Sequence, residues 1–425
     1  MSQTAIPQAA PPPAAPAAVR PATAAQATPA PEHVDTPALL NRWQLIGMTV
    51  AIVFGVVSAL VQFLAWQSDG RAAADTEQLV RVQEIQSSLL RADALATNAF
   101  LVGGLEEPDQ RAEYDDAIDS VLRNITDAAD AQPADRKVLD DLNVEVVDYA
   151  SAVTRARDNN RQGFPVGAQY LSDASAELRS DAIPILEALA DANTERAEGA
   201  MDGQHPFWLL VLGVAALLVL FWLNREQAQH FRRRVNKGLA AAALIVLVVT
   251  VVTVAGAWLR DGSNDDLRDG DLALAISQAD ARTAANDAKA NESLTLIKRG
   301  SGSTFETAWQ ESADVVEESL RRDTGESWAA YVAVHEQIVE LDRAGDWEGA
   351  RDLATTSGDD GSSKPLDDFD AASQVIVTGA GDVVTGDLRS GRVLALVLSA
   401  LTLLLGFGAA FAVSRGIGER RREFS

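Results

Sequence analysis

The sequence predicts an all-α membrane protein with four transmembrane helices and two extracytoplasmic antiparallel four-helix bundles, arranged as an internal duplication. Three observations predict this fold class: four uncharged apolar runs, two long acidic segments that separate them, and helical spacing of the apolar residues within those segments. A chain of 425 residues with 47% hydrophobic residues would suit two or three ordinary domains, but its apolar residues are concentrated in the four runs.

Residues 1–42 form a Pro/Ala-rich tract that begins MSQTAIPQAAPPPAAPAAVR and has no hydrophobic period. We expect a disordered cytoplasmic tail, because such a segment cannot bury enough apolar surface to fold. Because this tract precedes the first apolar run, the run begins too late in the chain for a cleaved signal peptide, and we expect it to remain as an anchor.

The apolar runs are Trp43 to Trp66, Phe207 to Leu223, Leu239 to Leu259 and Val393 to Val413, and none contains a charged residue. Each is about long enough to cross a bilayer as a helix. They predict transmembrane helices at residues 43–66, 207–223, 239–259 and 392–414. Several tryptophans lie near the ends of the runs, where an indole ring suits the headgroup region. Buried helices of a soluble core are the alternative interpretation.

Charge predicts the orientation of these helices. The short loop 224–238, NREQAQHFRRRVNKG, is basic, and so is the tail 415–425. The long segments 67–206 and 260–391 each hold 12 Lys/Arg and 28 Asp/Glu residues, a net charge of −16. Short basic loops stay in the cytoplasm. We therefore expect a multi-pass plasma-membrane protein with both termini in the cytoplasm and both acidic segments outside, a charge distribution that argues against nucleic-acid binding.

The two acidic segments also share a sequence pattern. Residues 149–175 align with 331–357 without a gap and match at 7 of 27 positions, with the skeleton Y...R-x-G-x-x-x-G-A-x-x-L-x-x-x-S. Further pairs follow in the same order, among them Asp93 with Asp287 and Pro184 with Pro365. This collinearity predicts two copies of one unit.

Each unit is predicted to be a helical bundle. Val82, Ile85, Leu89, Ala92, Ala96 and Ala99 recur at steps of three and four residues, as do Leu272, Ile276, Ala279, Thr283, Asn286 and Ala290. Breaks at GGLEEP, AQPAD and NRQGFPVG divide the first unit into four helices, and RGSGS, RRDTGES and RAGDW divide the second. We expect the first and last helices of each bundle to continue into the membrane.

Chain direction places some of these turns at the membrane-distal tip. The candidate residues for an extracytoplasmic partner at this tip are Glu106, Glu107, Arg161, Gly163, Arg343 and Gly345. The alternative interpretation is local: the glycines cap helices in the left-handed region, and the arginines offset helix dipoles. On the opposite side of the membrane, Arg232, Arg233, Arg234 and Lys237 are candidates for topology and for a cytoplasmic partner.

The sequence contains no recognisable catalytic motif. It has no cysteine, its four histidines are scattered, and its acidic clusters do not fit the order of ligands in an EF-hand. We therefore expect no enzyme activity, no cofactor and no metal site. A transporter is also disfavoured, since the four spans contain no ionisable residue. The remaining class is a sensor or adaptor that signals through another protein, because the chain has no attached output domain.

The chain resembles the GlnX-type tetra-spanning membrane proteins of actinobacteria. The resemblance rests on the architecture, on the basic hairpin FRRRVNKGL and on the strings ADALATNAFLVGG and NRQGFPVGAQYL. Each predicted bundle is also similar to the four-helix-bundle sensor domain of chemoreceptors. The first resemblance implies a relay in which an extracytoplasmic solute-binding lipoprotein senses aspartate or glutamate and the cytoplasmic serine/threonine kinase PknG receives the signal. It assigns no contact residues here.

Two other hypotheses remain open from the residues alone. One is a direct small-molecule sensor with chemoreceptor-like bundles. The other is a structural or permease-associated membrane protein.

Overall fold

The computed structural model describes residues 36–102, 108–162, 166–231, 236–358 and 360–421. Within these ranges all regular structure is helical and no strand occurs. The helices are α1 (Thr36–Val102), α2 (Pro108–Ala131), α3 (Arg136–Arg161), α4 (Val166–Glu177), α5 (Ile183–Met201), α6 (Pro206–Phe231), α7 (Lys237–Leu267), α8 (Ala273–Ile297), α9 (Ser303–Glu318), α10 (Arg322–Ala344), α11 (Trp347–Thr355), α12 (Ser363–Ser390) and α13 (Arg392–Arg421). The π-helical turns Leu178–Ala182 and Arg268–Leu272 join α4 to α5 and α7 to α8.

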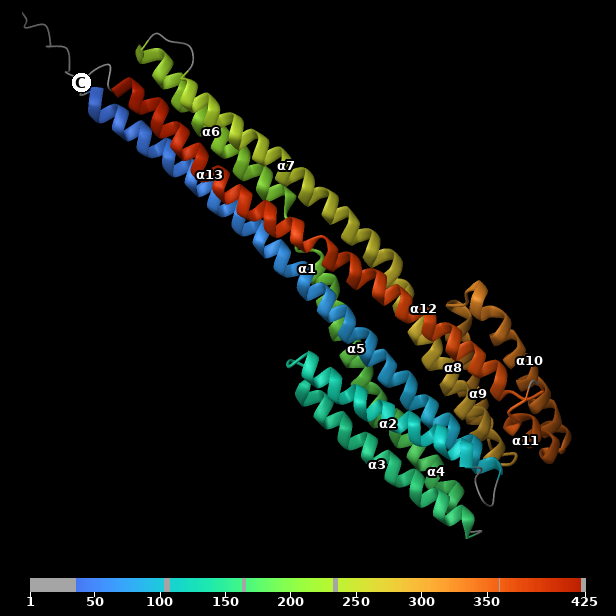
Figure 1. Cartoon of the computed structure of the whole chain (residues 1–425). Coiled ribbons are helices and arrows are strands. Elements are labelled where there is room, and N and C mark those ends of the chain that lie inside the picture. The colour runs from blue at the N-terminus through green and yellow to red at the C-terminus, as the bar shows by residue number, and fades with distance from the viewer. Residues whose placement is uncertain (1–35, 103–107, 163–165, 232–235, 359, 422–425) are drawn as a thin grey trace, which may run out of the picture.

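Four helical stretches in the described residues are long and apolar enough to cross a membrane, and their apolar parts lie in α1, α6, α7 and α13. In this part α1 packs on α13, α13 on α7, α7 on α6, and α6 on α1. Their shared core includes Phe54, Leu220, Val246 and Val413. The start of α1, the end of α6 and the end of α13 lie together at one end of the elongated molecule (Figure 1).

The first bundle consists of the later half of α1 with α2, α3 and the α4–α5 helix. The apolar stripe predicted on α1 is buried from Val82 to Ala99, and it meets core residues from all the other helices, such as Val121, Leu142 and Leu186. The helices end where the sequence breaks predicted, since α1 stops at Val102 before GGLEEP and α3 begins after AQPAD.

The second bundle consists of α8, α9, α10 and the α11–α12 pair. Its core is more aromatic than that of the first, with Trp309, Trp328, Tyr331 and Phe369 packed beside alanines of α8. The last helix of this bundle is interrupted between Thr355 and Ser363, a break that the sequence analysis did not predict. The corresponding helix of the first bundle passes through its π-helical turn without a break.

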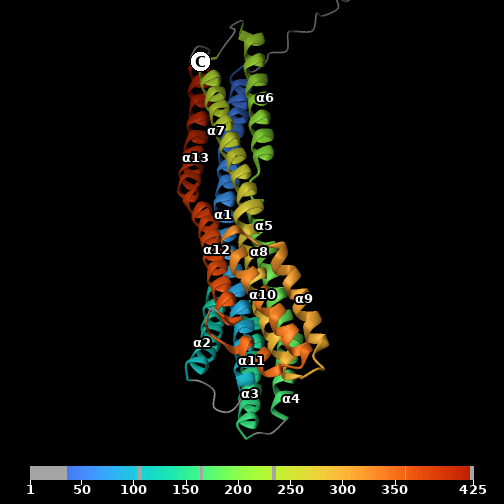
Figure 2. The ribbon, with the colours of Figure 1, turned by 90° about the vertical axis from the view of Figure 1, so that its right-hand side faces the viewer.

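The two bundles lie side by side because α1 packs directly on α8 and α12 (Figure 2). The internal repeat itself stays a prediction, although the two bundles have their helices in a similar order.

Continuity across the junction between the apolar helices and the bundles differs from the expectation. The first helix of each unit is continuous, as expected: α1 is one helix, and α7 joins α8 through the turn Arg268–Leu272. One returning helix does not run on, which corrects the expectation for the first unit: α5 ends at Met201 before α6 begins at Pro206. In the second unit only Gly391 lies between α12 and α13, and its backbone angles are α-helical, so this helix continues as expected. In the first case Pro206 explains the new start, since proline lacks the N–H that an interior helical position donates.

Small residues let α1 and α13 approach closely. A Cβ atom on Gly55 would lie 2.7 Å from the Gly406 Cα, and one on Gly406 would lie 2.5 Å from the Gly55 Cα. Polar contacts flank this crossing: Gln62 donates to Thr402 Oγ1 at 3.1 Å, and Ser399 donates to the Ala59 carbonyl at 2.8 Å. Glycine is required at the crossing because any side chain would collide with backbone.

The substitution Gly55→Ala should therefore lower the thermal unfolding midpoint of the protein in detergent, at an overpacking cost of about 1–3 kcal/mol. Gly408→Ala on the same pair of helices is the matched control, because no atom lies within 4 Å of a Cβ built there. Equal midpoints for the two variants would contradict close packing at Gly55.

Candidate functional site

The structure distributes the predicted partner residues over separate places. Arg161 is the exposed last residue of α3, and it pairs with Asp158 at 2.5 Å. Arg343 is exposed in the last turn of α10, in the other bundle. Gly345 caps α10 with φ of +86°, the left-handed conformation that the sequence suggested. Lys237 is the exposed first residue of α7. The remaining candidates, Glu106, Glu107, Gly163, Arg232, Arg233 and Arg234, lie outside the described residues.

A buried polar network between the bundles is the main feature that the sequence analysis missed. Its centre is Asp93 on α1, whose side chain is fully buried. Tyr149 of α3 donates its hydroxyl to Asp93 Oδ1 at 2.9 Å, and Ser175 of α4 donates to Oδ2 at 2.5 Å. Arg179 Nη1 donates to the same Oδ2 at 2.8 Å. The carboxylate is thus bonded by three other helical segments of its own bundle.

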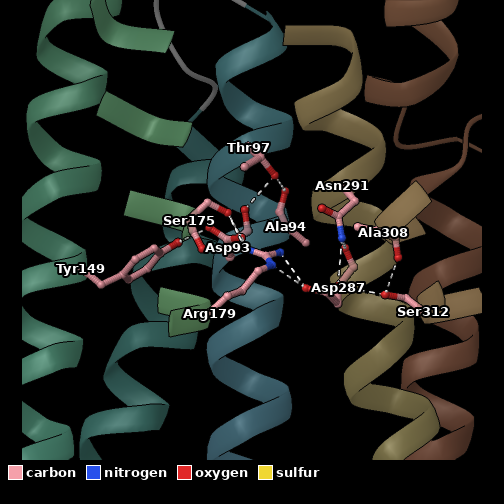
Figure 3. A network of polar contacts seen from close by, with 10 residues as sticks. All are labelled: Asp93, Ala94, Thr97, Tyr149, Ser175, Arg179, Asp287, Asn291, Ala308 and Ser312. Atoms are coloured by element: carbon pink, nitrogen blue, oxygen red, sulfur yellow. Dashed lines mark hydrogen bonds and ion pairs between the residues drawn. The ribbon is translucent and has the colours of Figure 1, made fainter. Parts of the chain in front are cut away.

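Arg179 also reaches the second bundle. Its Nε donates to Asp287 Oδ1 on α8 at 2.9 Å, and its Nη2 lies 2.7 Å from the same oxygen (Figure 3). Asn291 and Ser312 each donate to Asp287 Oδ2 at 2.9 Å. One guanidinium therefore joins Asp93 and Asp287, the two aspartates that the sequence alignment of the predicted repeat pairs with each other.

The local fold around Arg179 has an identifiable cause. Arg179 lies in the π-helical turn Leu178–Ala182. Pro184 lies two residues after the end of this turn, near the start of α5. Proline has no N–H for the carbonyl four residues earlier, and its ring collides with that carbonyl, so the helix widens there. Such π bulges are frequent at functional sites. The proline inside a helical segment was the available sequence signal.

The electrostatics of the network favour a charged arginine. Burial lowers the pKa of Arg179, but the charges of Asp93 and Asp287 and the hydrogen bonds to them outweigh burial and raise it above its ordinary value. Burial, followed by the charge of Asp93, raises the pKa of Tyr149 well above its ordinary range, so this hydroxyl keeps its proton. The network is therefore an ion pair shared between two bundles, with neutral donors around it.

A second arginine bridge lies farther along the same interface. Arg282 of α8 donates from Nε to Asp370 of α12 at 2.8 Å, and its Nη1 pairs with Glu84 of α1. Arg91 of α1 pairs in the other direction with Asp367 of α12 at 2.9 Å. Charged side chains of both bundles thus fix their relative position.

A cavity of about 730 Å³ adjoins the network between the bundles. Its lining includes Arg179 and Asp287 together with the acidic residues Glu187, Asp191 and Asp280. Desolvation, and next the charges of Asp191 and Glu187 from the first bundle, raise the pKa of Asp280 to about 6. In the described residues, no group of three or more His, Asp or Glu side chains is placed to hold a metal ion.

The junction with the apolar helices holds a further buried carboxylate, Asp69 on α1. Arg260 of α7 donates to Asp69 Oδ2 at 3.2 Å and also to the Asp387 and Leu388 carbonyls of α12 at 3.1 Å. Gln204, in the link between α5 and α6, donates to Asp69 Oδ1 at 3.1 Å. All four connections between bundles and apolar helices therefore meet near Asp69.

Replacing Arg179 should destabilise the bundle pair strongly. Arg179→Ala leaves Asp93 buried without its cation, and breaking a buried pair in this way costs roughly 3–5 kcal/mol. Denaturant unfolding of the full chain measures the loss. Because the chain lacks cysteine, engineered cysteines on exposed positions of α3 and α9 can carry spin labels that report a broader inter-bundle distance. Arg161→Ala is the control. An equal loss of unfolding free energy in that variant would contradict the assignment of Arg179 as the buried cation of Asp93.

Asp280 should make stability depend on pH. The pKa of its carboxyl is raised from 3.8 to about 6 in the folded chain, so between these values the folded state binds more protons than the unfolded state. The contribution of Asp280 to the free energy of unfolding should therefore fall as pH rises through this window. Asp280→Asn should be more stable than the parent at pH 7 and no more stable below about pH 4.

Urea unfolding at a series of pH values measures this difference, with Asp141→Asn on the exposed face of α3 as the control. An Asp280→Asn variant that gains nothing at neutral pH, or gains as much as Asp141→Asn, would contradict a strained carboxylate in the cavity lining.

Comparison with known proteins gives a partial match. Residues 68–202 match the family model of the actinobacterial sensor domain. This range covers the first bundle from the junction at Asp69 to the end of α5, and it includes Asp93 and Arg179. No curated protein and no solved structure matches the chain. The matched family is a family of sensor domains and not of enzymes, so it indicates a sensing or signalling role for the part of the chain that carries the network.

Proposed function

We propose that this protein is a non-enzymatic transmembrane signal relay that senses an extracytoplasmic solute and acts on a cytoplasmic protein. The observation that carries the proposal is the shared bridge of Arg179 between Asp93 on α1 and Asp287 on α8. Both of these helices continue without a break toward the apolar part of the molecule. A change in how the bundles pack would thus move two membrane helices relative to each other.

The junction supports the same proposal. Arg260 links α7 to Asp69 of α1 and to the end of α12, so one cation contacts all three helices at this junction. A packed interface with ionic bridges has discrete arrangements and does not deform continuously, and such two-state elements transmit signals. In our proposal the bundles lie outside the cell, and both termini and the loop 224–238 lie in the cytoplasm.

The proposed partners follow from the resemblance to GlnX-type proteins. They are an extracytoplasmic solute-binding lipoprotein that responds to aspartate or glutamate, and a cytoplasmic serine/threonine kinase. The membrane-distal ends of the bundles, with Arg161 and Arg343 exposed, are the proposed surface for the lipoprotein. The basic residues Arg232, Arg233, Arg234 and Lys237 are the proposed surface for the kinase.

A direct sensor is the second candidate function. The cavity of about 730 Å³ between the bundles favours it, because it is large enough for a small solute and touches the Arg179 network itself.

The test is affinity purification of the full-length protein from its native membrane, with and without added glutamate and aspartate, followed by mass spectrometry. We expect to recover a solute-binding lipoprotein and a kinase, with the amount of kinase depending on the solute. Arg260→Gln should keep the lipoprotein but lose the solute dependence of kinase recovery, because it removes the ion pair between α7 and Asp69.

Arg389→Gln is the matched control, since Arg389 makes an exposed pair between α12 and Glu77 of α1 near the same junction. Recovery of neither partner would contradict the relay. Solute dependence that survives in Arg260→Gln would contradict signal transfer through the junction.

A further inference from the structure

The core of the second bundle contains a buried charged cluster that the relay does not use. Glu292 of α8 is 1% exposed and accepts from Lys289 Nζ at 2.6 Å, from Ser362 Oγ at 2.8 Å and from His335 Nδ1 at 2.9 Å. Burial raises the pKa of Glu292, but the Lys289 charge and the His335 hydrogen bond outweigh it and hold this pKa at about 2. Glu292 is therefore ionised at any physiological pH.

This arrangement fixes the orientation of His335. Because ionised Glu292 accepts at Nδ1, that nitrogen carries the proton, and Nε2 faces the opposite way. Nε2 lies 3.6 Å from Glu306 Oε2 of α9, too far for a hydrogen bond. Both atoms are buried, and neither has a hydrogen-bond partner. The His335 side chain is only 3% exposed, so these two groups form at most a long ion pair, and each keeps a hydrogen-bonding position that a ligand in an adjoining cavity could fill.

The two orphaned atoms lie where two cavities meet. A cavity of about 390 Å³ and another of about 520 Å³ both have Glu306, His335, Val339 and Arg343 in their linings. Trp309 stacks on the imidazole with ring centroids 3.7 Å apart, and it also lines the larger cavity. Arg343 is exposed on the lining of both cavities and forms no ion pair with the described residues. The cavities thus have an acidic, aromatic interior and a basic group at the rim.

The charged groups around His335 indicate which kind of ligand the cavities suit. Burial lowers the pKa of His335, but the hydrogen bond with Glu292 and the proximity of Glu306 raise it above its ordinary value. The charged groups that face the site are Glu292 and Lys289 from α8, Glu306, Asp314 and Glu317 from α9, and Glu336, Glu340, Asp342 and Arg343 from α10; the α11–α12 side contributes Ser362 and the Ala354 carbonyl. Protonated His335 is the cation of Glu306, and when His335 is neutral Glu306 has no other ion-pair partner in the described part of the chain.

We propose that these cavities bind a small compound with a primary ammonium group. The ammonium lies in the cavities beside His335 Nε2 and Glu306 Oε2, which are 3.6 Å apart, and donates to both. It takes the place of the imidazolium proton, which leaves to solvent. The Trp309 ring beside it suits an organic cation. In a zwitterionic ligand the carboxylate lies toward Arg343. The site is separate from the Arg179 network, and the proposal stands whether or not the protein is a relay.

The test is isothermal titration calorimetry of the full chain in lipid nanodiscs with three probes: ethanolamine, glycine and acetate. We expect ethanolamine and glycine to bind once per chain and acetate not to bind. The binding heat should change with the ionisation enthalpy of the buffer, because His335 releases a proton. Affinity should rise as pH passes upward through the pKa of His335.

Variants make the assignment specific. Glu306→Gln should weaken ethanolamine binding about ten- to a hundredfold, the value of a charge-assisted hydrogen bond. Glu318→Gln is the matched control, on the exposed face of the same helix α9 and outside both cavities. Arg343→Gln distinguishes the ligand sources: loss of glycine affinity alone indicates a zwitterion, and unchanged affinities for both probes indicate a simple amine.

Absence of binding by both amines, or equal weakening by Glu306→Gln and Glu318→Gln, would overturn the proposal. Neither result would bear on partner recovery by affinity purification, so failure of this site and failure of the relay are distinguishable.

Discussion

A single buried guanidinium determines how the two bundles of this molecule are put together. Asp93 is fully buried and lies at the centre of the first bundle, so its charge has to be compensated there. Its cation, Arg179, is also the cation of Asp287 in the second bundle. Neither carboxylate forms another ion pair in the described part of the chain, so separating the bundles would leave Arg179 with Asp93 and take the cation from Asp287. The ionic requirement of one core thus fixes the position of the other.

Helix continuity determines which parts of the molecule would move when the packing at that interface changes. α1 is a single helix from Thr36 to Val102, and α7 continues into α8, whereas α5 stops at Met201 before α6 begins. A continuous helix transmits a shift or a rotation as a rigid body, and a break absorbs it. Both helices joined by Arg179 are continuous, and Arg260 connects the same pair again near the apolar helices. This coincidence is the strongest structural argument for a relay.

The sequence predicted features that depend on local periodicity and on turn residues. The apolar stripe from Val82 to Ala99 is buried, and the turns fall at the Gly- and Pro-rich breaks. Arg179 was not predicted as a site residue because its partners lie 86 and 108 positions away. Nothing in the local pattern tells such an arginine from the many exposed ones. His335 was missed for the same reason, since only the fold brings it to Glu292 and Glu306.

The two bundles compensate their buried carboxylates in different ways. In the first, Tyr149 donates to Asp93 and the compensating arginine is shared with the neighbouring bundle. In the second, the residue that the repeat pairs with Tyr149 is Tyr331, which accepts a hydrogen bond from Trp309. The buried acid there is Glu292, neutralised within its own bundle by Lys289. This acid therefore needs nothing from the first bundle, although Arg282 and Asp370 of the second bundle pair with Glu84 and Arg91 across the interface. The unsatisfied atoms closest to this acid, His335 Nε2 and Glu306 Oε2, face a cavity and not the interface, which leaves this part of the second core free to bind a ligand.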